Sequence, residues 1–293
     1  MQIPEQIKEL RRSVEQMAGR LDRRARRMIV RLRRFARGKT PALRADKFQM
    51  KKRIATAEIA RDGRMRPVSM MQELQAVADI HATLLGAGRA FCLSNNMTWV
   101  VTHYNIEILQ MPDDKEELQF ITWPLPHEAL RAVRDFEVRG ADGRPLIRAS
   151  SQWIMIDLTT RRPVKLTEKL PEWNSLTERA LDAPFDKMPD ELGAQSGARD
   201  FDIRYDDIDV NQHVNNAVYV LWATESLGYD FLMSHKLRGL RINFKKEIPA
   251  GAARVSVAFS IAPAPSGGVA TRHTIRTDSA THAVVECEWE VEK

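Results

Sequence analysis

The chain has 293 residues, 43% of them hydrophobic, so it is long enough for two ordinary domains and too apolar to be disordered throughout. No apolar run approaches the roughly 18–20 residues that cross a bilayer, and the first residues lack the apolar core of a secretory signal. Residues 1–53 carry 18 Lys/Arg and 5 Asp/Glu, whereas the remainder carries 27 and 34. The net charge of +6 therefore comes from the first part alone.

The two cysteines, Cys92 and Cys287, are far apart and lie outside any Cys-x-x-Cys motif. Two such residues cannot build a zinc site unaided. They favour a reducing compartment, with both thiols buried and inert. We therefore expect a cytoplasmic protein, or a plastid one if it comes from a plant or alga.

The basic part, residues 1–40, is predicted to be an amphipathic helical arm. Apolar residues recur every three or four positions over residues 4–37, and arginines occupy the other faces. Such a helix suits an anionic membrane surface or an acidic partner, and binds nucleic acid without sequence specificity. Its apolar stripe equally suits packing on the rest of the chain or on a second copy, as in a homodimer. A cleaved targeting peptide is disfavoured, because the arm has one serine and early glutamates.

Residues 47–158 show the order strand, helix, several strands. A β-like run to Ile59 is followed by the turn Asp62-Gly63, and Pro67 suits the first turn of a helix that reaches about Leu85. Four further strands are predicted at Asn96–Leu109, Glu117–Trp123, Ala129–Val138 and Arg144–Asp157. This order predicts an α+β domain in which an antiparallel sheet wraps around a central helix.

A proline-containing linker at residues 159–199, with a short helix near Ser175–Leu181, separates this domain from a second one at residues 200–293. The second domain repeats the order, with a strand at Asp200–Tyr205 and a helix at Asn216–Leu227. Its later strands are expected near Leu237–Glu247, Ala253–Ala262, Val269–Thr277 and His282–Val291. Superposing the two helices sets Gly63 against Asn211 and Met65 against His213.

A dense polar segment stands directly before the second helix. It contains Asp206, Asp207, Asp209, Asn211, His213, Asn215 and Asn216. Such residues cap a helix N-terminus, where four backbone N–H groups lack internal partners. Free N–H groups also suit negative charge that develops on a substrate oxygen. Judged by residue types alone, capping and turn chemistry is the commoner explanation, and a lone histidine is usually structural.

The order Asp209-Val-Asn211-Gln-His213-Val-Asn215-Asn216, followed by a helix with Trp222 and Glu225-Ser226, resembles the active-site segment of acyl-acyl-carrier-protein thioesterases. The resemblance extends over roughly residues 47–292 and is strongest at residues 204–227. It implies two tandem hot-dog domains, each an antiparallel sheet around a helix. The second domain alone keeps the polar motif, so the first is expected to form the acyl pocket.

The resemblance also implies the catalytic residues. Asp209, Asn211 and His213 match alternate positions of the family motif, and Glu247 matches a later glutamate in a run like Phe244-Lys245-Lys246-Glu247. Glu247 would act as general base on water and Asn211 would polarise the thioester carbonyl. His213 would orient Asn211 or share proton transfer, and Asp209 would hold the array in register. From spacing alone, Glu247 would pass for an ordinary charged residue at a strand end.

Several other chemistries lack their motifs in this sequence. There is no G-x-S-x-G nucleophile elbow, no G-x-G-x-x-G fingerprint and no H-E-x-x-H zinc motif, so neither a cofactor nor a metal is expected. Plant members of the family carry a cysteine directly after the glutamate, long taken as a nucleophile, whereas this chain has Ile248. That difference counts against a thiol mechanism and favours activation of water.

The implied activity is hydrolysis of long- or medium-chain acyl groups from acyl carrier protein, an acidic partner. Three alternatives stay open: an acyl-coenzyme A thioesterase of the same fold, a hydratase or dehydratase that leaves the thioester intact, and a membrane-peripheral acyl-binding protein without turnover. The proposed walls of the acyl pocket are Met70, Met71, Leu74 and Trp99, although ordinary core packing would account for all four.

Overall fold

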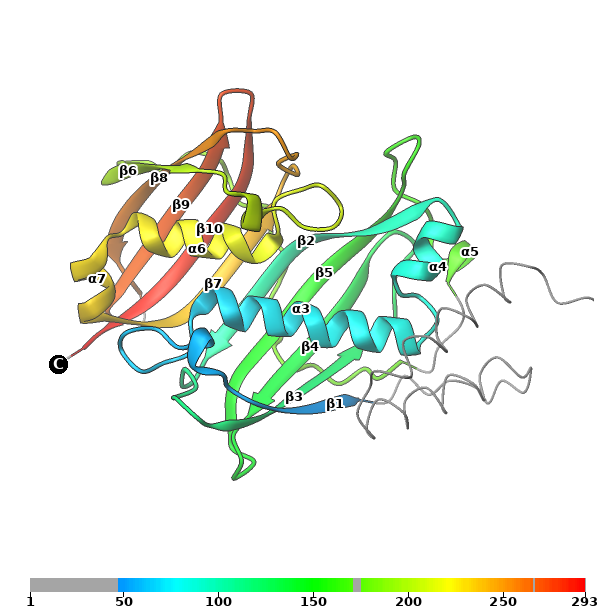
Figure 1. Ribbon diagram of the computed structural model, residues 1–293, viewed down its shortest axis with the longest axis horizontal. Coiled ribbons are helices and arrows are strands. Elements are labelled where there is room, and N and C mark those ends of the chain that lie inside the picture. The colour runs from blue at the N-terminus through cyan, green and yellow to red at the C-terminus, as the bar shows by residue number, and fades with distance from the viewer. Residues whose placement is uncertain (1–46, 171–174, 266, 293) are drawn as a thin grey trace, which may run out of the picture. The chain divides into compact units, whose positions relative to one another are not determined.

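The computed structural model describes residues 47–170, 175–265 and 267–292. The strands of the described residues form one antiparallel sheet, and two long helices cross a single face of it (Figure 1). The helical arm predicted for residues 1–40 lies outside the described residues. None of the described helices combines the length and the apolar character needed to span a bilayer.

The first half follows the predicted order. After β1 comes a 3-10 turn at Thr56–Glu58, and the later elements are close to their expected bounds. A short helix, α4, was not predicted, because six residues show no clear periodicity. The elements are β1 (Phe48–Arg53), α3 (Pro67–Leu84), α4 (Arg89–Ser94), β2 (Met97–Ile108), β3 (Glu117–Pro124), β4 (Ala132–Arg139) and β5 (Pro145–Asp157).

The second half repeats this order and adds a short helix, α7, after the long one. Its strand β9 has the bounds that the sequence predicted, and the other strands differ by a few residues at their ends. The elements are β6 (Gly197–Asp202), α6 (Asn216–Ser226), α7 (Tyr229–Ser234), β7 (His235–Phe244), β8 (Arg254–Pro263), β9 (Val269–Thr277) and β10 (Ala280–Val291).

The helix predicted near Ser175–Leu181 is wrong. The linker instead has one helical turn, α5 (Leu166–Lys169), and residues 175–181 contain no helix. Side chains of the sheet bind the backbone here: Trp123 Nε1 donates to the carbonyl of Glu178 at 2.9 Å, and the N–H of Ala180 donates to Asp135 Oδ2 at 2.7 Å. These bonds occupy backbone groups that a helix would need for its own ladder.

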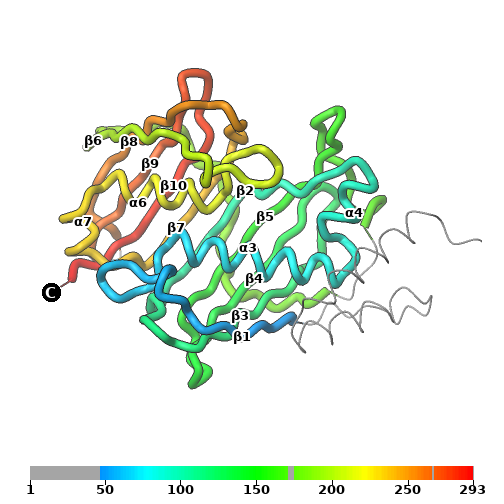
Figure 2. Tube along the Cα trace, viewed as in Figure 1, coloured from blue at the N-terminus to red at the C-terminus, as the bar shows by residue number. Residues whose placement is uncertain are grey.

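The two halves form one continuous ten-stranded sheet in the order β1-β3-β4-β5-β2-β7-β10-β9-β8-β6. The central pair is β2 with β7, antiparallel from His103 opposite Asn243 to Glu107 opposite Gly239. Helix α3 lies over the first half, α6 lies over the second, and the two helices contact each other (Figures 1 and 2). Because β2 and β7 pair, elements of the two halves lie side by side at the centre of the sheet.

The core lies between these helices and the sheet. On α3, Met70, Met71 and Leu74 are at most 1% exposed. On α6, Trp222 stacks on Phe201 with ring centroids 6.4 Å apart. Removing a buried tryptophan of this kind typically costs about 3–5 kcal/mol of unfolding free energy. Each helix is therefore held by the burial of its core-facing residues, which also fixes where the loop before it ends.

Candidate active site

The polar segment before α6 folds into a tight loop that Asp209 closes. Asp209 Oδ1 accepts hydrogen bonds from the N–H groups of Asn211 at 2.7 Å and His213 at 3.4 Å. The N–H of Asp209 donates to the carbonyl of His213 at 2.8 Å. Gln212 has a φ of 63°, the left-handed conformation that such a turn requires. Asp209 therefore fixes the backbone that presents Asn211 and His213, and its part in catalysis stays a prediction.

Other residues of the segment serve the fold instead. Asn215 caps α6, because its Oδ1 accepts from the N–H of Ala217 at 2.9 Å. Asp207 is 1% exposed and accepts from both the backbone N–H and the guanidinium of Arg204, at 2.8 and 2.7 Å. Capping thus accounts for Asp207 and Asn215, and the alternate positions Asp209, Asn211 and His213 remain available for chemistry.

The segment that follows β7 forms the second wall of the site. The N–H of Val214 donates to the carbonyl of Ile248 at 2.9 Å, and the N–H of Ala250 donates to the carbonyl of Gln212 at 2.8 Å. This pairing brings Glu247 to His213, with Oε2 and Nε2 3.5 Å apart. Both side chains are about 30% exposed, so substrate and water can reach them.

The structure adds Arg161, which sequence reasoning missed. Its guanidinium contacts the same Oε2 of Glu247 that faces His213. Arg161 has a φ of 58° in the turn after β5, and its N–H donates to the carbonyl of Asp157 at 2.9 Å. The turn is rigid because Asp157 Oδ1 also accepts from two following N–H groups. No sequence spacing could have found Arg161, since 86 residues separate it from Glu247.

Tyr219 of α6 is a buried neighbour of the segment that carries Glu247. It is 2% exposed, and its hydroxyl lies against the backbone of Ile248. Burial raises the pKa of Tyr219, and the nearby carboxylates of Glu247 and Asp209 raise it further. The hydroxyl is therefore neutral and able to hydrogen-bond. In the sequence it occupies an apolar helical position, so only the fold distinguishes it from ordinary core.

Neither cysteine is a suitable nucleophile. Cys92 and Cys287 are each 2% exposed. Burial raises the pKa of Cys92 to about 11 and that of Cys287 to about 12, so both remain thiols at neutral pH. Within the described residues, no group of three or more His, Cys, Asp and Glu side chains is arranged to hold a metal ion.

The first half repeats the backbone of the Asp209–His213 loop without its side chains. The N–H of Ala60 donates to the carbonyl of Arg64 at 2.7 Å, as that of Asp209 donates to His213. Ala60, Asp62 and Arg64 therefore correspond to Asp209, Asn211 and His213. The predicted register, which set Gly63 against Asn211 and Met65 against His213, is wrong by one residue. The apolar helical positions do not mark where each loop closes, whereas the bridges Ile59–Met65 and Ile208–Val214 do.

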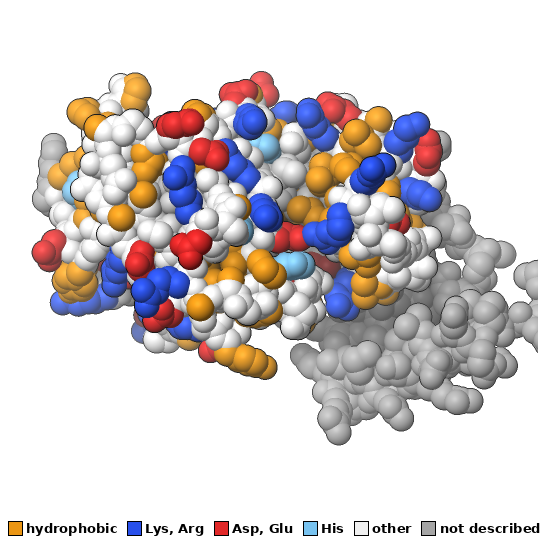
Figure 3. All heavy atoms as spheres, turned by 90° about the horizontal axis from the view of Figure 1, so that it is seen from above, with side chains coloured by type: hydrophobic (Ala, Val, Ile, Leu, Met, Phe, Trp, Pro, Cys, Tyr) orange, Lys and Arg blue, Asp and Glu red, His pale blue; other side chains and the backbone are white. Residues whose placement is uncertain are grey.

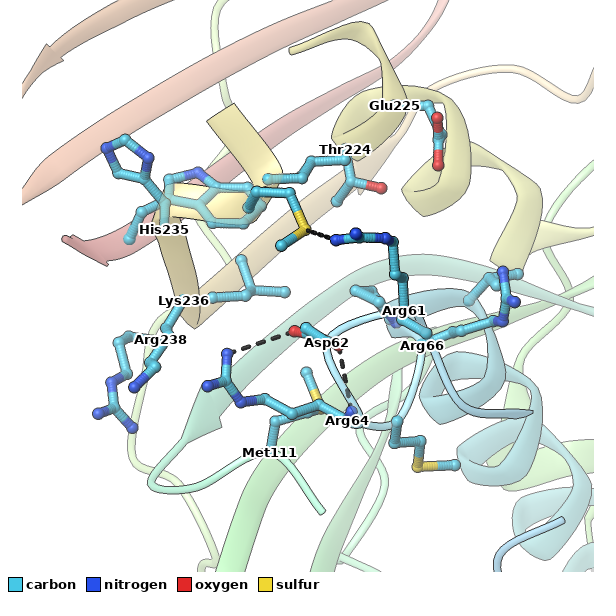
Figure 4. A pocket seen from close by; sticks show the side chains of 18 of the residues that line it. Arg61, Asp62, Arg64, Arg66, Met111, Thr224, Glu225, His235, Lys236 and Arg238 are labelled. Carbon is cyan, nitrogen blue, oxygen red and sulfur yellow. Dashed lines mark hydrogen bonds and ion pairs between the residues drawn. The ribbon is translucent and has the colours of Figure 1, made fainter. Parts of the chain in front are cut away.

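The counterpart of Glu247 is also replaced in the first half. The N–H of Met65 donates to the carbonyl of Pro112 at 2.7 Å, as that of Val214 donates to Ile248, so Met111 stands at the position of Glu247. A cleft of about 610 Å³ opens beside this loop. Figure 4 shows Arg64 pointing to Asp62 there, with Met111 nearby. This cleft lacks the His213–Glu247 pair and is not the catalytic candidate.

The proposed acyl-pocket residues separate into two groups. Trp99 lines a cavity of about 130 Å³ between the C-terminal half of α3 and strands β2–β5. Met70, Met71 and Leu74 do not line that cavity and belong to the main core instead. Their role in binding an acyl chain stays a prediction.

Two helix-on-sheet halves, joined edge to edge with one of the two loops keeping a polar set, make this a double hot-dog protein. Residues 45–172 match the family described as acyl-ACP thioesterase N-terminal domain, and residues 191–291 match its C-terminal domain. The chain therefore belongs to the acyl-ACP thioesterase family, as its polar motif had indicated.

Curated relatives include a palmitoyl-acyl carrier protein thioesterase, chloroplastic, of Gossypium hirsutum, 31% identical over 208 residues, which are 66% of this chain and 50% of that protein. Another, with the same name in Arabidopsis thaliana, is 29% identical over 83% of this chain and 63% of that protein. The chain thus spans about half to two thirds of the length of these relatives.

Among solved structures, the putative oleoyl thioesterase from Lactobacillus plantarum is 27% identical, with a TM-score of 0.75, over 87% of this chain and 100% of that one. The 12:0-ACP thioesterase from Umbellularia californica has a TM-score of 0.72 over 84% of this chain and 94% of that one. At 19% identity, the second match shows the fold alone.

Proposed function

We propose that this protein hydrolyses fatty acyl thioesters carried on acyl carrier protein, using water activated by Glu247. The observation that carries the proposal is the pairing of Glu247 with His213, 3.5 Å apart, beside the loop that Asp209 closes around Asn211. A carboxylate within reach of water, together with an amide donor, is what hydrolysis without a covalent enzyme intermediate requires.

In the proposed reaction, Glu247 takes a proton from water, and the water oxygen attacks the carbonyl carbon of the thioester. The side-chain amide of Asn211 donates to the carbonyl oxygen as it becomes negative. When the C–S bond breaks, the proton passes from Glu247, directly or through His213, to the departing thiolate. The products are a fatty acid and the free thiol of the carrier.

Arg161 and Tyr219 are proposed as positioning residues for this base. Arg161 holds one carboxylate oxygen of Glu247, and the hydroxyl of Tyr219 lies against the backbone of the next residue, Ile248. Asp209 is proposed to position Asn211 in the same way, because Asn211 Nδ2 donates to Asp209 Oδ2 at 3.4 Å. The base and the donor are therefore each held by a second side chain, which keeps their distance to a bound thioester constant.

The carrier is proposed from the charge around the site. Arg162, Lys169 and Lys246 are exposed, close in sequence to Arg161 or Glu247, and form no ion pair with any described residue. The face seen in Figure 3 carries Lys and Arg side chains interspersed with acidic and hydrophobic ones. An acidic carrier protein would be attracted to these cations. Rates measured with one acyl chain on acyl carrier protein and on coenzyme A test this choice, and faster turnover of the coenzyme A substrate would reject it.

The basic arm offers a second contact with acidic surfaces. Deleting residues 1–40 is expected to leave a folded, active enzyme, because the family match begins at residue 45. Its binding to acyl carrier protein or to anionic vesicles should weaken. The difference should shrink with salt, since the Debye length falls from about 10 Å at 0.1 M to about 3 Å at 1 M. Co-sedimentation with vesicles and KM for the carrier measure the effect.

The same deletion tests whether the arm pairs two copies of the chain. Size-exclusion chromatography of the full chain and of the shortened chain would reveal a homodimer that depends on residues 1–40. An unfolded deletion product would contradict the proposal, because it would show that the apolar stripe completes the core.

The double variant Cys92→Ala, Cys287→Ala is expected to keep near-native turnover. Both thiols are buried and protonated, so neither can attack a thioester. Each substitution removes one buried sulfur and should lower the free energy of unfolding by about 1 kcal/mol. Release of free carrier thiol under saturating substrate measures kcat. A folded but inactive double variant would show that the mechanism depends on a thiol.

The cellular compartment is proposed from the two cysteines, Cys92 and Cys287. Two unpaired thiols fit a reducing environment, and the curated relatives are named as chloroplastic proteins. We propose that the protein works in the cytoplasm or, in a plant or alga, in the plastid. Fractionation of the source cells tests this proposal.

A further inference from the structure

The 130 Å³ cavity of the first half contains a buried cation. Its walls are mostly apolar and come from α3, the loop before α4, and strands β2, β3, β4 and β5. They comprise Ala78, Ala82, Ala87, Gly88, Trp99, Pro124, Ala132, Val133 and Trp153. The charged or amide-bearing residues among its walls are Gln75, Asp79 and Arg134. Such a cavity has about the size that accepts a benzene-sized apolar group, and hence one segment of an acyl chain.

Arg134 has no counter-ion within the described residues. Arg134 is 9% exposed. Its Nη1 donates to His81 Nδ1 at 3.0 Å and to Thr122 Oγ1 at 3.2 Å. Nε and Nη2 make no hydrogen bond to any residue that the structure describes, and neither is one of its fully buried unpaired atoms, so both are accessible to a small ligand. The neighbouring carboxylate, Asp135, is bound to Arg179 and Ser150 and is not among the cavity walls.

His81 cannot supply the missing negative charge. Burial and the adjacent Arg134 lower the pKa of His81 to about 3, so the imidazole is neutral and serves as an acceptor. A second donor belongs to a wall residue of the same cavity, Gln75, whose buried Nε2 has no hydrogen-bond partner within the described part of the chain. The cavity therefore offers donors from two side chains, and its exposed carboxylate, Asp79, makes no ion pair with Arg134.

An unpaired buried cation and an unpaired buried amide are both costly, and a ligand that brings an acceptor offsets that cost. We propose that this cavity receives the part of an acyl chain that bears an oxygen substituent, a hydroxyl, keto or carboxylate group, which accepts hydrogen bonds from Arg134 and Gln75. The inference rests on the proposed function, since it takes the acyl group of the thioester as the ligand. It makes Arg134 the residue that selects oxygenated acyl chains over plain ones.

The sheet places this cavity near the candidate active site. Trp99 pairs with Met155, and two residues along, Met97 pairs with Asp157. Asp157 begins the turn that carries Arg161 to Glu247. A strand rises about 3.3 Å per residue, so the cavity residue Trp99 lies roughly 7 Å along β2 from Met97, the residue paired with Asp157. One acyl chain can therefore have its thioester at Glu247 and its distal part beside Arg134.

The test compares acyl carrier protein substrates of one chain length that end in a methyl, a hydroxyl or a carboxylate group, with hydroxyl groups also placed along the chain. The full-length enzyme should show a kcat/KM for at least one oxygenated chain about tenfold or more above that for the plain chain. Arg134→Met should remove this preference, and Arg134→Lys should keep part of it. The carboxylate and hydroxyl substrates distinguish whether charge or hydrogen bonding dominates.

Arg139→Met is the matched control, because Arg139 is on the same strand but pairs with Glu137 at the surface. It should leave the ratio unchanged. Arg134→Met is expected to fold, since methionine keeps much of the apolar length of the side chain and removes a buried charge that has no counter-ion. A wild-type enzyme that prefers plain chains, or an Arg134→Met variant with an unaltered ratio, would overturn the proposal.

A binding measurement separates this inference from the proposed hydrolysis. Calorimetry of the full chain with free hydroxy, dicarboxylic and plain fatty acids requires no turnover. Tighter binding of an oxygenated acid, lost in Arg134→Met, would support the cavity proposal even if no thioester were cleaved. Equal binding of all three acids would refute it, whether or not Arg134→Met folds and whatever the enzyme hydrolyses.

Discussion

Glu247→Gln is expected to lower kcat by about 10²–10⁴-fold. The substitution keeps the shape of the side chain and its contacts with Arg161 and His213, but an amide cannot take a proton from water. KM for the acyl carrier should change little, because the carrier binds through surfaces outside this residue. Release of free thiol, followed under single-turnover conditions, isolates the chemical step from product release.

Glu290→Gln is the control for that experiment. Glu290 pairs with Arg238 and lies opposite Lys236 at the start of β7, whereas Glu247 follows the other end of that strand. Loss of the Glu290 carboxylate should therefore leave kcat unchanged. The mechanism proposed above would be wrong if Glu247→Gln worked normally while the cysteine double variant were inactive, even if the enzyme still cleaved acyl thioesters.

Asn211→Ala is expected to lower kcat by about 10²–10³-fold, the effect typical of losing one donor to a developing oxyanion. The side chain is exposed and touches Asp209, so its removal creates no cavity. Because the donor acts mainly in the transition state, kcat and kcat/KM should fall together. Steady-state rates over a range of substrate concentrations distinguish this result from a loss of binding.

Gln212→Gly provides a matched comparison on the same loop. Gln212 is also an exposed amide, and its φ of 63° is one that glycine adopts without strain. This variant should retain most activity. If both variants lose activity equally, the loss reflects distortion of the loop, and Asn211 is not the donor.

The fold could be predicted from the sequence because each element carries a local pattern. Pro67 begins a helix with regular apolar spacing, and Asn215 caps the second helix as its residue type suggests. The helix expected near Ser175–Leu181 failed because side chains distant in sequence, Trp123 and Asp135, bind that backbone. Local propensity does not include such bonds.

The candidate site was only partly predictable. Asp209, Asn211 and His213 stand in one short run, whereas Glu247 emerged through its resemblance to a family motif. Arg161 contacts Glu247 from a turn of the first half, and the buried Tyr219 lies against the backbone of the next residue, Ile248; neither leaves a pattern in the sequence. The Arg161 contact also depends on the joint between the two halves of the sheet.

The repeated loop of the first half shows whether this loop needs a histidine and a glutamate in order to fold. Ala60 and Arg64 form the same backbone bond as Asp209 and His213, although Arg64 and Met111 stand where the other copy has His213 and Glu247. The loop therefore folds without an imidazole or a carboxylate at those positions. Substitutions at His213 and Glu247 should accordingly leave the melting temperature nearly unchanged, so that lost activity in such variants measures chemistry rather than unfolding.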